Sequence, residues 1–113
     1  MHELSLCGAI ADLVSRRTGE RRVATVHLRI GEMRQVVPST LAYCWSMVTA
    51  GSPLDGCLLD TERIPALLRC RSCGAENGMG EVFVLACRDC GALDVEVVSG
   101  EEFVVTAVDL INA

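Results

Sequence analysis

The sequence predicts an α/β (α+β) fold, in which a small mixed three-stranded sheet packs with two helices and carries an inserted four-cysteine module. Three observations support it: two apolar segments with a helical period, β-prone segments before and after a cysteine-rich stretch, and two Cys-x-x-Cys pairs inside that stretch. The 113 residues are 50% apolar but only 4% aromatic, which indicates one small domain, or one domain carrying a smaller module.

The first helix is expected over residues 3–17. Apolar residues recur there at helical spacing (Leu4, Cys7, Ala11, Val14), with Leu6, Ile10 and Leu13 beside them. Arg16 and Arg17 fall in the last turn, where cations are favoured, and Gly19 marks the end.

A half-buried strand is expected over residues 22–30, because Ala24, Val26, Leu28 and Ile30 alternate with Val23, Thr25, His27 and Arg29. Pro38 then opens a second helix that runs to about residue 50, with Gly51 as its stop. A second strand follows over residues 57–64.

Inside the cysteine-rich module, residues 82–85 and 93–98 are expected to form short strands. The run from 103 to 111 predicts a third long strand, whose apolar faces need a larger sheet than the module can supply. We therefore expect this strand to return to the first two. Residues 1–66 and 100–113 would then form the α/β domain, and residues 67–99 a zinc-binding module inserted into it.

The zinc assignment follows from the spacing of Cys70-x-x-Cys73 and Cys87-x-x-Cys90. Two such turns facing each other make a tetrahedral cage of four thiolates, which suits Zn(II). A closed four-sulfur site leaves no position for water or substrate, so this zinc is expected to be structural. Gly74 and Gly91 follow the pairs, where a cysteine turn often needs a positive φ.

Charge and hydropathy exclude several classes of function. The formal charge is −5, all ten positive charges are arginine, and four thiolates around one Zn(II) would bring the total to roughly −7. Nucleic-acid binding favours a basic face with aromatic platforms, which this chain lacks. No segment reaches the roughly 18 apolar residues of a membrane span, and no signal peptide is evident. We expect a cytoplasmic protein with reduced thiols.

The remaining cysteines and His27 do not suggest catalysis. Cys7, Cys44 and Cys57 lie on apolar faces of predicted elements, where core packing is the expected role. His27, beside Thr25 and Arg29, is expected to be structural or at the surface. Because no catalytic constellation can be identified, we expect no enzyme activity.

His2 follows the first residue directly, and this position gives it a chemistry of its own. The amine of Met1, the amide nitrogen of His2 and the imidazole Nδ1 can close adjacent chelate rings around one metal ion. Deprotonated amide nitrogens favour planar Ni(II) or Cu(II). The alternative is an arbitrary residue before the first helix.

Together these features resemble the HypA/HybF family of nickel chaperones. The resemblance rests on MHELSL at the start, LRIGEM at the end of the first strand, the helix after Val37-Pro38, and CRSCG and CRDCG ahead of the terminal strand. It covers essentially the whole chain. Members of the family mature [NiFe]-hydrogenases and, in some bacteria, urease.

The resemblance implies Ni(II) as transient cargo at Met1, His2 and Glu3, and structural Zn(II) at Cys70, Cys73, Cys87 and Cys90. It also implies three partners: a nickel-handling GTPase metallochaperone, the hydrogenase large subunit and, in some bacteria, urease maturation proteins. Many relatives carry proline within a cysteine turn, whereas this chain has Arg71-Ser72 and Arg88-Asp89, which puts the rigidity of each turn in question.

The sequence thus indicates a nickel-binding metallochaperone with a structural zinc site, as a monomer or a homodimer. The alternative is a zinc-ribbon module that binds protein or nucleic acid and has no nickel role.

Overall fold

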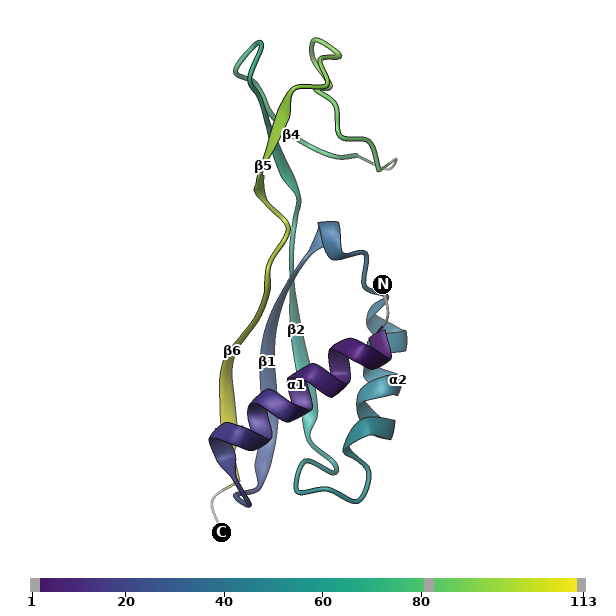
Figure 1. Ribbon diagram of the computed structural model, residues 1–113, viewed down its shortest axis with the longest axis vertical. Helices are drawn as coiled ribbons and strands as arrows, with labels where there is room; N and C mark the ends of the chain where they lie inside the picture. Colours follow the sequence, from purple (N-terminus) through teal and green to yellow (C-terminus); the bar gives the residue numbers. More distant parts are fainter. Residues whose placement is uncertain (1–2, 81–82, 112–113) are drawn as a thin grey trace.

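The computed structural model describes residues 3–80 and 83–111 as an elongated molecule of 56 × 22 × 17 Å. Two three-stranded sheets follow each other along the long axis (Figure 1). The first sheet has the order β2-β1-β6 and the second the order β4-β3-β5. Neither helix in these ranges is long and apolar enough to cross a membrane.

The first sheet is built from β1 (Val23–Gly31), β2 (Leu58–Ile64) and β6 (Phe103–Leu110). β1 lies in the centre, pairs parallel with β2 and pairs antiparallel with β6. The parallel pair requires a crossover, which α2 (Pro38–Thr49) provides after the short 3-10 helix η1 (Glu32–Arg34). As expected, the last strand returns to the first two.

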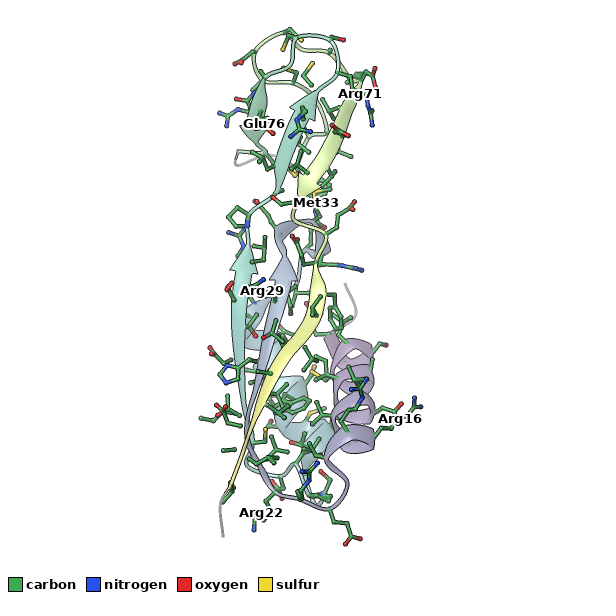
Figure 2. The ribbon with its side chains drawn as sticks, turned by 90° about the vertical axis from the view of Figure 1, so that its left-hand side faces the viewer. Arg16, Arg22, Arg29, Met33, Arg71 and Glu76 are labelled. Carbon is green, nitrogen blue, oxygen red and sulfur yellow. The ribbon has the colours of Figure 1, made fainter. Side chains whose placement is uncertain are left out.

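Both helices lie on the same side of this sheet (Figure 2). α1 (Glu3–Thr18) buries Cys7, Ile10, Val14 and Thr18, whereas Leu4 and Leu13 stay largely exposed at the edges of the apolar stripe. α2 contributes Leu41, Cys44 and Trp45 to the same core. The indole Nε1 of Trp45 donates to the Cys57 carbonyl oxygen at 2.9 Å, which fixes α2 to the start of β2.

The alternation predicted for β1 is correct except at its first residue. Val26, Leu28 and Ile30 are buried against the helices, and His27 and Arg29 lie on the other face. Val23 was expected with the second set but is buried. A register shift between Val23 and Thr25 in the pairing with β6 interrupts the alternation there.

The second sheet consists of β3 (Leu67–Cys70), β4 (Glu76–Gly78) and β5 (Val95–Ser99). The sequence predicted β5, but it did not predict β3 or β4. The strand expected over 82–85 is wrong at residues 83–85, which carry no strand and are about half exposed; Val82 lies outside the described residues. These residues are β-prone, but they do not join the second sheet, which consists of β4, β3 and β5.

The two sheets meet where three backbone segments touch. A Cβ on Gly31 would lie 1.9 Å from the Gly100 carbonyl oxygen, and one on Gly100 would lie 2.6 Å from the Ala66 Cα. The Met33 amide donates to the Gly100 carbonyl at 2.8 Å. The Met33 side chain, labelled in Figure 2, packs on a small second core of Ala66, Leu68 and Met79. We call this region the waist (residues 31–33, 66 and 100).

Candidate metal centre

The four cysteines of the predicted zinc site meet at the tip of the second sheet. Cys70 ends β3 and Cys87 opens the corresponding second turn. The two turns have the same hydrogen bonds: Cys70 N donates to Ala75 O at 2.9 Å and Cys87 N to Ala92 O at 2.8 Å. Gly74 and Gly91 close them with φ of 78° and 77°, as the sequence predicted.

The sulfur positions fit a tetrahedral metal. All four Sγ atoms lie within 4.8 Å of one another, and both the Cys70–Cys90 and Cys73–Cys87 pairs are 3.6 Å apart. A zinc ion bound at about 2.3 Å by four thiolates requires sulfur separations of about 3.8 Å. The cluster therefore fits Zn(II) with little rearrangement, and an ion in it would have a complete protein shell.

Each turn favours the thiolate form of its first cysteine, whereas hydrogen bonds among the clustered thiols raise the pKa of the second cysteines, Cys73 and Cys90. The Cys73 amide donates to Cys70 Sγ at 3.4 Å, and the Cys90 amide to Cys87 Sγ at 3.4 Å. The first of these hydrogen bonds is the largest contribution that lowers the pKa of Cys70 to about 6. The pKa of Cys87 is lowered for the same reason, by the Cys90 amide.

Ion pairs hold the first cysteine turn, whose rigidity the absence of a proline had put in question. Arg71 binds the Asp94 carboxylate at 2.9 Å, and its amide donates to the Asp94 carbonyl at 3.0 Å. Arg69 bridges Glu76 at 2.7 Å and Glu96 at 3.2 Å. Figure 2 shows Arg71 and Glu76 near this end of the molecule. Both arginines are therefore neutralised within the module, which leaves them poorly suited to bind phosphates.

Of the three predicted nickel residues, the structure describes Glu3. Met1 and His2 lie outside the described residues. Glu3 begins α1, and its Oε2 accepts the Val37 amide proton at 3.0 Å. Val37 is the cap residue of α2, so Glu3 lies where the N-terminal ends of both helices meet. Sequence patterns do not reveal this contact, because it joins residues 34 positions apart.

The three remaining cysteines lie in a hydrophobic core, and His27 contacts two carboxylates. Cys7, Cys44 and Cys57 are buried in the first core, as expected. Burial raises the pKa of Cys7 to about 11 and also raises that of Cys57, so both stay as thiols. His27 lies on the open face of the first sheet, where Asp60 and Asp109 bind its two ring nitrogens.

Glu32 is a connecting residue that the sequence did not reveal. Its Oε1 accepts the Ala66 amide proton at 2.8 Å, and its Oε2 pairs with Arg63 at 3.2 Å. It therefore fixes η1 to the segment that leads from the first sheet into the second. The LRIGEM motif contains this glutamate, but the motif alone does not show that Glu32 binds the Ala66 amide and Arg63.

Comparisons with known proteins agree with this architecture. The family model described as "Hydrogenase/urease nickel incorporation, metallochaperone, hypA" matches residues 1–110. The hydrogenase maturation factor HypA of Geotalea uraniireducens is 39% identical over 102 residues, which cover 90% of this chain and 92% of the relative. That of Streptomyces avermitilis is 35% identical over 112 residues, covering 96% and 86%.

Among solved structures, the solution structure of the Ni metallochaperone HypA from Helicobacter pylori matches with a TM-score of 0.65 over 100% of both chains. At 18% sequence identity this likeness establishes the fold. A second solution structure of a HypA protein matches with a TM-score of 0.60.

Proposed function

The chain belongs to the HypA family of hydrogenase/urease nickel incorporation metallochaperones, and we propose that it binds Ni(II) as cargo and delivers it during maturation of [NiFe]-hydrogenase. The observation that carries this proposal is the family match over residues 1–110, which includes both the Met1-His2-Glu3 segment and the four cysteines. Membership in this family places the chain in hydrogenase maturation.

We propose that Ni(II) is held by the amine of Met1, the backbone nitrogens of His2 and Glu3, and the imidazole of His2. These nitrogen donors suit Ni(II), which stands high in the divalent affinity order. An ion held at the end of a chain can be handed to another protein more readily than one in a closed cage. The site therefore suits binding and release, and we propose no catalytic step for this protein.

The zinc site has a different role in this proposal. Cys70, Cys73, Cys87 and Cys90 fill all four positions of a tetrahedron, and the cluster geometry supports Zn(II) as a resident structural ion. Its coordination adds folding free energy on the order of 10 kcal/mol in small modules. The second core, in which three of the described residues are buried, offers little to replace it.

The proposed partners are a nickel-handling GTPase, the hydrogenase large subunit and, where urease is present, its maturation proteins. A GTPase that receives or supplies nickel must approach the first residues, and would there meet the start of α1. The acidic balance of −5 argues against nucleic acid as a partner, and so does the pairing of Arg69 and Arg71 within the module.

Calorimetry with three forms of the zinc-loaded protein tests the nickel proposal. The forms are the native protein, the protein with an uncleaved N-terminal tag, and His2→Ala. A residue before Met1 moves the amine and breaks the first chelate ring, so nickel affinity should collapse in the tagged form and in His2→Ala. Zinc content and circular dichroism should stay unchanged. Equal nickel affinity in all three forms would reject the proposed site.

A further inference from the structure

The Glu3 carboxylate joins the N-terminal ends of the two helices. Its Oε2 accepts the amide proton of Val37, the cap residue of α2, at 3.0 Å. α2 has no acidic residue in its first turn, and its cap residue makes no side-chain hydrogen bond. A carboxylate from α1 therefore supplies the negative charge that a helix N-terminus favours.

The loop that leads to this contact is fixed on its other side. Gln35 has a φ of 53° and donates its amide proton to the Glu32 carbonyl oxygen, which ends η1. Glu32 in turn binds the Ala66 amide. The amide of Val37 is thus presented by a well-connected segment, and Glu3 docks the first turn of α1 onto it.

We infer that the Glu3 carboxylate is a positioning group for the nickel site and not a nickel ligand. This inference rests on the nickel-binding function proposed above. The nitrogen donors proposed there provide four ligands without a carboxylate. Anchoring residue 3 reduces the number of backbone torsions that must be ordered when Ni(II) binds, so the contact should raise affinity through preorganisation.

Two pairs of matched variants distinguish a positioning group from a ligand. Glu3→Gln keeps an oxygen that can accept the Val37 amide proton, but an amide oxygen is a much weaker nickel ligand than a carboxylate; Glu3→Ala removes both functions. Val37→Pro removes only the donated proton, and Val37→Ala keeps it while shortening the side chain. Val37 has φ −89° and ψ 113°, so a proline there needs only a small backbone adjustment toward its usual φ of about −65°.

Nickel affinity should fall about tenfold in Glu3→Ala and in Val37→Pro, the loss expected for one hydrogen bond to a charged group. In Glu3→Gln and Val37→Ala it should stay within about threefold of the native value, because both variants keep the hydrogen bond between residues 3 and 37. The visible absorption spectrum of bound Ni(II) should be the same in all four variants, because the donor atoms do not change. Zinc content and circular dichroism establish that each variant is folded.

Two outcomes of the affinity measurements would overturn the inference. If Glu3→Gln loses as much affinity as Glu3→Ala while Val37→Pro binds normally, the carboxylate is a ligand. If all four variants bind like the native protein, Glu3 positions nothing.

Hydrogen exchange of the Val37 amide in the nickel-free protein separates this inference from the proposed function. The amide should exchange slowly in native protein and Glu3→Gln, and fast in Glu3→Ala. Slow exchange with no nickel binding by native protein would reject the proposed function but leave the contact. Fast exchange in native protein would reject the contact itself.

Discussion

At the scale of single residues, His27 connects all three strands of the first sheet. Its Nδ1 lies 3.0 Å from an Asp60 oxygen on β2, and its Nε2 lies 2.8 Å from an Asp109 oxygen on β6. The other charged groups on this face, Arg29 and Glu62, pair with each other at 3.4 Å. A protonated imidazole can donate to both carboxylates at once, so this charge state favours the assembled sheet.

This arrangement makes the stability of the sheet depend on pH. The hydrogen bond to Asp109, followed by that to Asp60, raises the pKa of His27 above its usual 6.5. Because the folded pKa is the higher one, the stabilisation is fully present below about pH 6.5 and is lost as the pH rises through the folded pKa.

We expect a His27→Gln variant to be less stable than the native protein at pH 6, with a difference that shrinks as the pH rises. Denaturant unfolding at several pH values measures this, and an NMR titration gives the pKa of His27 directly. Asp109→Asn should lower that pKa more than Asp60→Asn. A pKa near 6.5 in the native protein would show that the two carboxylates do not act on His27.

The sequence predicted the cysteine cluster but not the contacts of His27 and Glu3. The spacing of the cysteines indicated their cluster, because each pair is local and the ligand geometry is specific. It could not indicate that His27 lies between Asp60 and Asp109, which are 33 and 82 positions away. Their meeting depends on the register of three strands, which is set by the whole sheet. The contact of Glu3 with Val37 escaped prediction for the same reason.

At the scale of elements, the long segments followed their sequence pattern, whereas of the short strands in the second sheet β5 did and β3 and β4 did not. Expected helix 3–17 is observed as Glu3–Thr18, and expected strand 103–111 as Phe103–Leu110. β3 and β4 have only four and three residues, too few to show alternation. Conversely, residues 83–85 are β-prone but form no strand. Local propensity was decisive only where enough residues reinforced it.

The second sheet should depend on its metal far more than the first. Among the residues that the structure describes, three buried ones form its core, against twelve in the first core. In Cys73→Ala, or after removal of zinc by a chelator, residues 67–100 should therefore unfold while the first sheet persists.

Hydrogen exchange should show lost protection in β3, β4 and β5, with protection retained in β1. Cys57→Ala is the matched control, since it removes a buried thiol outside the cluster and should keep one zinc per chain. X-ray absorption of the purified protein should show sulfur alone around the metal. A nitrogen or oxygen ligand, or a second sheet that keeps its protection without metal, would contradict this account.

At the scale of the whole molecule, the waist determines how the two sheets are joined. Chain segments cross it between Ile64 and Leu67 and between Ser99 and Phe103, and η1 packs beside them (Figure 1). The backbones of Gly31, Ala66 and Gly100 approach too closely there for a side chain on either glycine. The waist also lies between the loop that holds Glu3 and the cysteine cluster, so its rigidity bears on both ends of the molecule.

Gly31→Ala should therefore destabilise the protein. The added Cβ would lie 1.9 Å from the Gly100 carbonyl oxygen and 2.6 Å from the Glu101 amide nitrogen, both backbone atoms that cannot rotate away. Either the two strands separate or the hydrogen bond from Met33 to Gly100 breaks, at a cost of roughly 3 kcal/mol. Gly8→Ala is the matched control: no atom lies within 4 Å of its added Cβ, and alanine in a helix should stabilise by about 0.5–1 kcal/mol. The free energy of unfolding, measured with denaturant, should fall in Gly31→Ala and rise in Gly8→Ala. X-ray scattering should show a changed molecular length for Gly31→Ala alone. Equal stability of Gly31→Ala and native protein would mean that the strands can part at the waist without cost, and that the two sheets are not held rigidly together.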